Sequence, residues 1–107
     1  FRWTGSRAGA RIVLDGSGRS AAYELGCGAP LARLPGRMQT VEVFWQGRRL
    51  EKVVFTTNTR RPLRIAGRAH EAGFLELIVS PTFNMKRLGL GEESRELGVQ
   101  FCGPTCD

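Results

Sequence analysis

The sequence lacks any long apolar run, and it contains few residues that carry catalysis. No stretch approaches the roughly 18 apolar residues of a membrane-spanning helix, and there is no signal-peptide pattern. The single histidine, His70, lies beside Glu71 in a polar turn, where a solvated side chain is expected rather than a general base. Serines occur at turns without the Gly-x-Ser-x-Gly pattern of a nucleophile elbow. We therefore expect a segment that is neither an enzyme nor a membrane span.

Metal-binding patterns are missing as well. Asp15 and Glu92 do not belong to an aspartate-rich cluster of the kind that binds calcium. The Cys-x-x-x-Cys sequence at residues 102–106 has no second pair of ligands, so it cannot fill the four positions of a zinc ion. We expect no metal and no cofactor.

The charge balance is basic but not patterned for nucleic acid. Sixteen lysines and arginines face ten acidic residues, which gives a net charge of +6. Such a surplus suits an anionic partner such as nucleic acid, an anionic lipid surface or an acidic glycan. The arginines are scattered, however, and no RNP, helix-turn-helix or zinc-finger motif accompanies them. The simpler explanation is an arginine-rich proteome together with solubility, and we expect no nucleic-acid binding.

The apolar residues occur in short stretches that predict β-strands. Fourteen glycines and five prolines in 107 residues favour many turns over long helices. The clearest stretch is 40–46, where Val41, Val43 and Trp45 share one face and Phe44 points to the other. Strands are expected at residues 1–4, 10–14, 20–25 (alternatively a helical turn), 40–46, 50–55, 63–66, 74–79 and 97–102. Gln-Gly-Arg-Arg at residues 46–49 is expected to form a hairpin turn between strands 40–46 and 50–55. This spacing predicts an all-β fold, an antiparallel jelly-roll-like β-sandwich of about eight short strands.

Length and composition indicate one domain over residues 1–107, with 41% hydrophobic residues to form a single core. The chain begins at Phe1 rather than methionine. We expect it to be a segment of a larger chain.

The longest interval without an expected strand is residues 80–96, which is unusually long for a loop inside a compact domain. Leu88 and Leu90 are expected to anchor it. Arg95 is expected to staple it to the sheet by binding Glu93 or backbone carbonyls. The alternative is a solvated charged turn without a structural role.

The chain resembles a known family in four places. They are Phe1-Arg-Trp-Thr4, the strand and turn at 41–47, Ser80-Pro81, and Leu-Gly-Leu-Gly-Glu-Glu-Ser-Arg-Glu-Leu-Gly-Val at residues 88–99. The family is the β-sandwich module of large bacterial cell-surface glycosyltransferases and related multi-spanning membrane transferases. Its last loop reads approximately Leu-Gly-x-Ser/Gly-x-Asp-x-Arg-x-Leu-Gly-Val. Here Glu93 stands in place of the aspartate, and Met85-Lys86 replaces an expected proline.

The resemblance implies a non-catalytic, carbohydrate-binding-like accessory domain outside the cytoplasm, either periplasmic or on the outer face. Its partners would be a saccharide of the cell surface and the parent membrane transferase. The competing interpretation is a structural module that docks on the transferase or a protein partner without binding sugar.

Sugar binding requires an exposed aromatic ring, because sugar rings stack their C–H faces on such side chains. Trp45 and Trp3 are expected to pack mainly in the core. Phe44 with Arg48 or Arg49 is the better candidate surface, and Trp3 is the weaker candidate. An exposed aromatic beside arginine and polar groups in a groove would favour sugar binding. Two buried tryptophans and a flat arginine-rich face would favour docking.

Three cysteines allow three single disulfides. Cys102 and Cys106 are closest in sequence, with Gly103 and Pro104 between them to form a bend, so this pair is expected. The alternatives are a bridge from Cys27 to either of them, or no disulfide.

Overall fold

The computed structural model describes residues 2–20 and 22–103. Its regular elements are β1 (Arg2–Trp3), β2 (Arg7–Val13), β3 (Tyr23–Gly26), η1 (Leu31–Arg33), η2 (Pro35–Arg37), β4 (Gln39–Trp45), β5 (Arg48–Phe55), β6 (Arg60–Leu63), β7 (Ala72–Ser80) and β8 (Gln100–Cys102), where η marks a 3-10 turn. Over the described ranges there is no α-helix, and no helix is long and apolar enough to cross a membrane.

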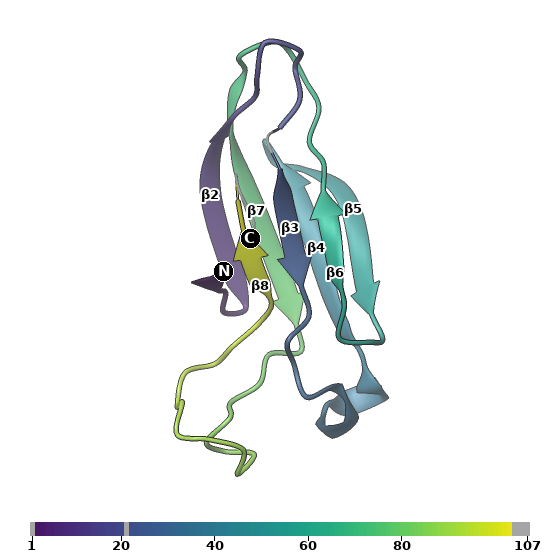
Figure 1. Ribbon diagram of the computed structural model, residues 1–107, viewed down its shortest axis with the longest axis vertical. Helices are drawn as coiled ribbons and strands as arrows, with labels where there is room; N and C mark the ends of the chain where they lie inside the picture. The colour runs from purple at the N-terminus through teal and green to yellow at the C-terminus, as the bar shows by residue number, and fades with distance from the viewer. Residues whose placement is uncertain (1, 21, 104–107) are drawn as a thin grey trace.

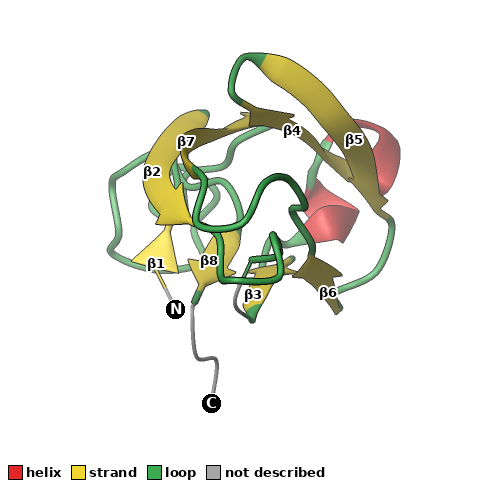
Figure 2. Cartoon of the chain, turned by 90° about the horizontal axis from the view of Figure 1, so that it is seen from above, coloured by secondary structure: helices red, strands yellow, loops and turns green. Residues whose placement is uncertain are grey.

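The strands form two four-stranded antiparallel sheets that face each other (Figure 2). Sheet I has the order β1-β8-β3-β6, and sheet II has the order β2-β7-β4-β5. The predicted all-β sandwich is therefore confirmed. Strands β1 and β2 lie along one side of the sandwich, and β5 and β6 lie along the opposite side.

Among the strands that the structure describes, only β4 and β5 follow each other in the chain and pair within the same sheet, as a hairpin. Gln46 and Gly47 form its turn with φ angles of 52° and 80°. Two successive positive φ angles are typical of the type I′ turn, whose twist matches that of the strands it joins. The predicted turn is thus in the predicted place.

The core lies between the sheets because strand residues alternate between buried and exposed positions. Val41, Val43 and Trp45 of β4 are buried, as their shared face predicts. On the neighbouring β7, the inward residues are Leu75, Leu77 and Val79. Sheet I contributes residues such as Leu25, Leu63 and Phe101 from the other side.

Several strand limits differ from the sequence prediction. β2 begins at Arg7 rather than residue 10, because β7 pairs with the whole of Arg7–Val13 despite its weak strand propensity. β6 occupies Arg60–Leu63 instead of residues 63–66; Pro62 is tolerated there because β6 is an edge strand. β8 is limited to Gln100–Cys102.

The loops gather at the two ends of the sandwich (Figure 1). One end holds the turn after β2 and the turn before β7, joined where Gly67 N donates to Gly18 O at 2.7 Å. The other end holds η1, η2 and the long loop after β7, where Arg33 Nη2 donates to Leu88 O at 3.2 Å.

Candidate functional site

Phe44 and Arg49 lie side by side on the face of sheet II that points away from sheet I, called here the outer face. Phe44 is half-buried and lies opposite Arg49 on β5 and Glu76 on β7. Arg49 Nη1 is 3.4 Å from Glu42 Oε2, so its charge is already partly matched within the sheet. The predicted pair therefore exists, but it leaves little aromatic surface and no free cation.

The other two candidates lie elsewhere. Arg48 is the register partner of Trp45, whose ring is buried between the sheets, so it does not share the face of Phe44. Trp3 belongs to sheet I and is 38% exposed, so the expectation that it packs in the core is wrong. Its ring meets Phe83 edge-on, with the centroids 5.7 Å apart. The four candidates thus do not form one site.

Phe74 is the exposed aromatic residue that the sequence analysis missed. Its side chain is on the outer face of β7 and is 53% exposed. The tip of the ring rests on the backbone of Gly9 in β2. Only glycine allows this approach, because a Cβ at that position would collide with Cζ of the ring. A ring supported by backbone and open to solvent is a suitable stacking platform. Period-two alternation with Leu75 buried could have identified it.

A shallow hollow of about 240 Å³ lies beside the Phe74 ring. It is lined by Arg11, Gln46, Ala72, Gly73 and Phe74. The Gln46 side chain fixes the hollow, because its Oε1 accepts from Phe74 N at 3.1 Å and its Nε2 donates to Ala72 O at 3.3 Å. The hollow therefore joins an aromatic ring, an amide and a guanidinium.

Arg11 is the cation of this hollow. The neighbouring Arg7 is 3.5 Å from Glu76, whereas Arg11 forms no ion pair within the described ranges. Its donors are available to the hydroxyl or carboxylate oxygens of a ligand.

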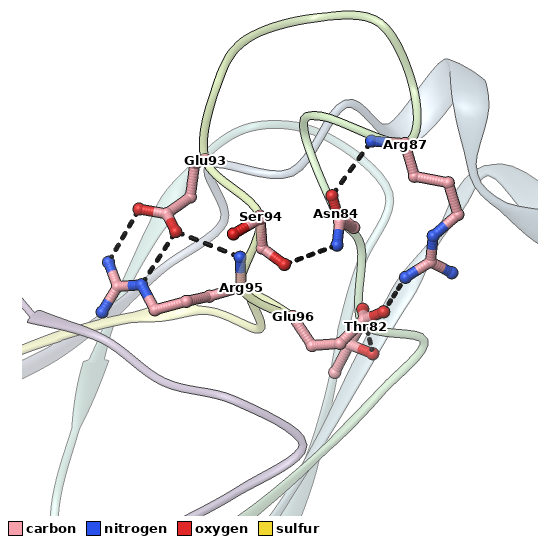
Figure 3. Close-up of polar contacts among 7 residues, drawn as sticks. All are labelled: Thr82, Asn84, Arg87, Glu93, Ser94, Arg95 and Glu96. Carbon is pink, nitrogen blue, oxygen red and sulfur yellow. Dashed lines mark hydrogen bonds and ion pairs between the residues drawn. The ribbon is translucent and has the colours of Figure 1, made fainter.

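The 80–97 loop is held by a local network of polar contacts (Figure 3). Asn84 Nδ2 donates to Ser94 O at 2.7 Å, which joins the outgoing and returning chains. Glu96 forms an ion pair with Arg87 and accepts from Thr82 Oγ1 at 3.2 Å. At the base, Phe83 and Leu97 exchange backbone hydrogen bonds of 2.9 and 2.7 Å.

The Glu93–Arg95 pair forms, but it does not staple the loop to the sheet. Arg95 Nε and Nη2 donate to the two oxygens of Glu93 at 2.9 and 3.0 Å. Both residues belong to the same loop, and the Arg95 side chain is 70% exposed. The expected tie to the sandwich is therefore wrong. Leu88 packs against the core as expected, whereas Leu90 is exposed.

Gln39, rather than Arg95, ties the loop to the sheet. This fully buried side chain at the start of β4 donates from Nε2 to Pro81 O at 3.1 Å and to Gly98 O at 3.0 Å. It thereby holds the departing and returning ends of the loop. A glutamine just before an apolar strand looks like a surface residue in the sequence, so nothing in the sequence marked it.

The two described cysteines differ in their bonding. Cys102 is disulfide-bonded, whereas Cys27 is a free thiol buried near Gln39 and Asn58. Burial raises the pKa of the Cys27 thiol. A bridge from Cys27 is therefore excluded. Cys106, the expected partner of Cys102, lies outside the described residues.

Histidine, cysteine and acidic side chains are the groups that could bind a metal in the described ranges, 2–20 and 22–103. His70 is exposed in a turn with a φ of 58°. No three histidine, cysteine or acidic side chains there cluster closely enough to hold a metal ion.

No protein-family model matches this chain, and neither a curated protein nor a solved structure matches it.

Proposed function

We propose that the chain is a non-catalytic, carbohydrate-binding accessory domain that holds a polysaccharide through the hollow beside Phe74. The observation that carries this proposal is the exposed Phe74 ring next to Arg11 and Gln46. A sugar ring would stack on Phe74, and its hydroxyl groups would bind the guanidinium and the amide. The free charge of Arg11 and the net charge of +6 favour a saccharide that carries carboxylates.

The proposal includes a setting for this binding. The motif at residues 88–99 resembles that of modules on bacterial membrane glycosyltransferases, so the domain would act beside such an enzyme, outside the cytoplasm, on cell-surface polysaccharide. Within this proposal, the sandwich is a jelly roll. The strand order supports it, since every connection except the β4–β5 hairpin crosses between the sheets.

The second candidate function is docking on the parent transferase or another protein without sugar. It is supported by the outer face of sheet II, where Val13 of β2 and Val54 of β5 are exposed and the ion pairs Arg7–Glu76 and Arg49–Glu42 lie between these two ends of the sheet. Exposed apolar residues within a charged surround are typical of protein interaction surfaces.

A glycan array separates the two functions. The domain should bind acidic bacterial oligosaccharides, and Phe74→Ala should reduce that binding by tenfold or more, since a stacked ring contributes about 1.4 kcal/mol or more. Phe74→Tyr should retain it. Leu50→Ala serves as the matched control, because it removes an exposed apolar side chain from β5, away from the hollow.

Equal binding by the parent and Phe74→Ala would place the sugar elsewhere. No binding to any glycan, together with failure of the parent transferase to assemble when the domain is deleted, would favour docking.

A further inference from the structure

The side of the sandwich formed by β1 and β2 is open. These two strands end sheet I and sheet II on the same side (Figure 2), and a cleft of about 320 Å³ lies between them. Its lining includes Ala8, Ala10, Leu75, Leu77 and Phe101 as apolar residues, with Arg2 and Arg7 at its rim. None of the described residues that line it is acidic.

Small side chains on β2 explain the opening. Ala8 and Ala10 point inward from β2, in register with Leu77 and Leu75 of β7, and are too short to cover the core edge. The opposite side of the sandwich is closed by larger residues, Val53 and Phe55 of β5 and Leu63 of β6. There, Arg61 is 3.5 Å from Glu51 across the two sheets.

The free edge of β2 also offers backbone hydrogen bonds. At one end Ser6 O accepts from Val79 N, and at the other Leu14 N donates to Glu71 O, both at 2.8 Å. Even-numbered residues between them therefore bond to β7, since hydrogen-bonded pairs alternate along an antiparallel ladder. The odd-numbered residues direct their N–H and C=O groups away from the sheet; they are Arg7, Gly9, Arg11 and Val13.

The charged side chains of β2 itself are all of one sign, although Arg7 also pairs with Glu76 of the neighbouring β7 at 3.5 Å. The side chains of Arg7 and Arg11 lie on the outer face, four residues apart along the strand with Gly9 between them. A strand added to this edge would alternate between two environments: its inward side chains would enter the cleft over Ala8 and Ala10, and its outward side chains would lie beside these arginines.

We propose that β2 binds an extended segment of a partner protein as an added strand, and that this segment alternates apolar with acidic residues. Its backbone completes the ladder of β2, its apolar side chains fill the cleft over Ala8 and Ala10, and its carboxylates meet Arg7 and Arg11. This site goes beyond the saccharide hollow, because it uses the strand edge and the cleft rather than the Phe74 ring.

A second copy of the chain is a poor occupant of the same edge. Two antiparallel β2 strands centred on Gly9 would place Arg7 of each beside Arg11 of the other, and like charges directly opposite destabilise a strand pair. Arginine on an edge strand also opposes uncontrolled self-pairing.

The test uses two synthetic peptides matched in length to the seven residues of β2. One alternates valine with glutamate, and the other alternates valine with lysine. The glutamate peptide should bind about tenfold more tightly than the lysine peptide. Glutamate side chains attract Arg7 and Arg11 at the exposed edge, whereas lysine side chains are repelled by them. On binding it should slow amide hydrogen exchange at Arg7, Gly9, Arg11 and Val13, because those N–H groups acquire acceptors.

Arg7→Glu should weaken binding of the glutamate peptide and strengthen binding of the lysine peptide, while Arg48→Glu, a matched change on β5, should affect neither strongly. Ala10→Leu, which fills the cleft, should weaken both peptides, and far-UV circular dichroism checks that each variant folds. Equal affinity for the two peptides, or unchanged exchange at the four amides, would overturn the proposal. Protection of those amides in the free protein that grows with its concentration would assign the edge to a second copy instead.

Discussion

The single side chain of Gln39 contributes more to the stability of the fold than the exposed ion pairs of the surface do. Its amide joins β4 to both ends of the 80–97 loop, and it is fully buried. Loss of a buried donor leaves its acceptors without partners and without water, which costs more than loss of an exposed ion pair. Burial of the contact, rather than formal charge, therefore decides which residue holds the loop.

Gln39→Met keeps an unbranched side chain of similar length but removes the amide. We expect the free energy of unfolding to fall by about 2–4 kcal/mol, because the carbonyls of Pro81 and Gly98 lose their donor. Arg95→Ala, the control, should lower it by less than about 1 kcal/mol, since its ion pair is exposed. Urea denaturation measures both. A larger effect for Arg95→Ala than for Gln39→Met would reverse the roles assigned here.

Cys27 and the disulfide give a second prediction at the scale of single residues. If Cys102 pairs with Cys106, the ring contains only three intervening residues, so it restricts the unfolded chain little. Reducing agent should then shift Tm only slightly. Thiol reagents should not modify Cys27 in the native protein, because its thiol is buried. Non-reducing peptide mapping checks the pairing. A peptide that links Cys27 to another cysteine, or a large fall in Tm on reduction, would contradict it.

At the scale of elements, the turn after β2 is organised by one carboxylate. Asp15 Oδ1 accepts from Ser17 Oγ at 2.5 Å, from Ser17 N at 2.8 Å and from Arg19 N at 3.1 Å. The hydrogen bond from the Ser17 hydroxyl, followed by those from the two backbone amides, lowers the pKa of Asp15 below its usual 3.8. The turn thus depends on the charged form of the side chain.

A lowered pKa in the folded state fixes the sign of the pH dependence. The contribution of Asp15 is present above its unfolded pKa of 3.8 and is lost as the pH falls through the lower folded value. The urea midpoint of the parent should therefore fall more steeply below pH 4 than that of Asp15→Asn, which cannot titrate. Parallel curves for the two proteins would show that the carboxylate charge contributes nothing to the turn.

The sequence predicted those elements whose own residues carry the pattern. Alternation of Val41, Val43 and Trp45 identified β4, and the Gln46-Gly47 turn identified its hairpin. Residues 7–9 did not look like a strand, because their conformation comes from pairing with β7, a partner more than sixty residues away.

The candidate site was harder to predict because it depends on neighbours across strands. Phe44 and Phe74 both point outward, yet only Phe74 has a glycine beside it on which the ring can rest. That relation between Phe74 and Gly9 follows from strand order and register, neither of which the sequence alone supplied.

At the scale of the whole molecule, the sandwich presents two different surfaces for binding. The outer face of sheet II offers an aromatic ring with polar groups, while the β1–β2 side offers a free strand edge over a cleft floored by Ala8, Ala10 and the core. The two share Arg11, which lines the hollow and lies on the edge strand. A saccharide and a peptide strand would therefore influence each other at that residue.

Chemical-shift mapping by NMR tests the central claim, that this domain binds saccharide through the Phe74 hollow. The isotope-labelled domain is titrated with an acidic bacterial oligosaccharide up to millimolar concentrations. We expect the largest shifts at the amides of Phe74, Arg11 and Gln46, and the loss of those shifts in Phe74→Ala. No shifts at millimolar saccharide, or shifts centred on the exposed Trp3 of sheet I, would contradict it.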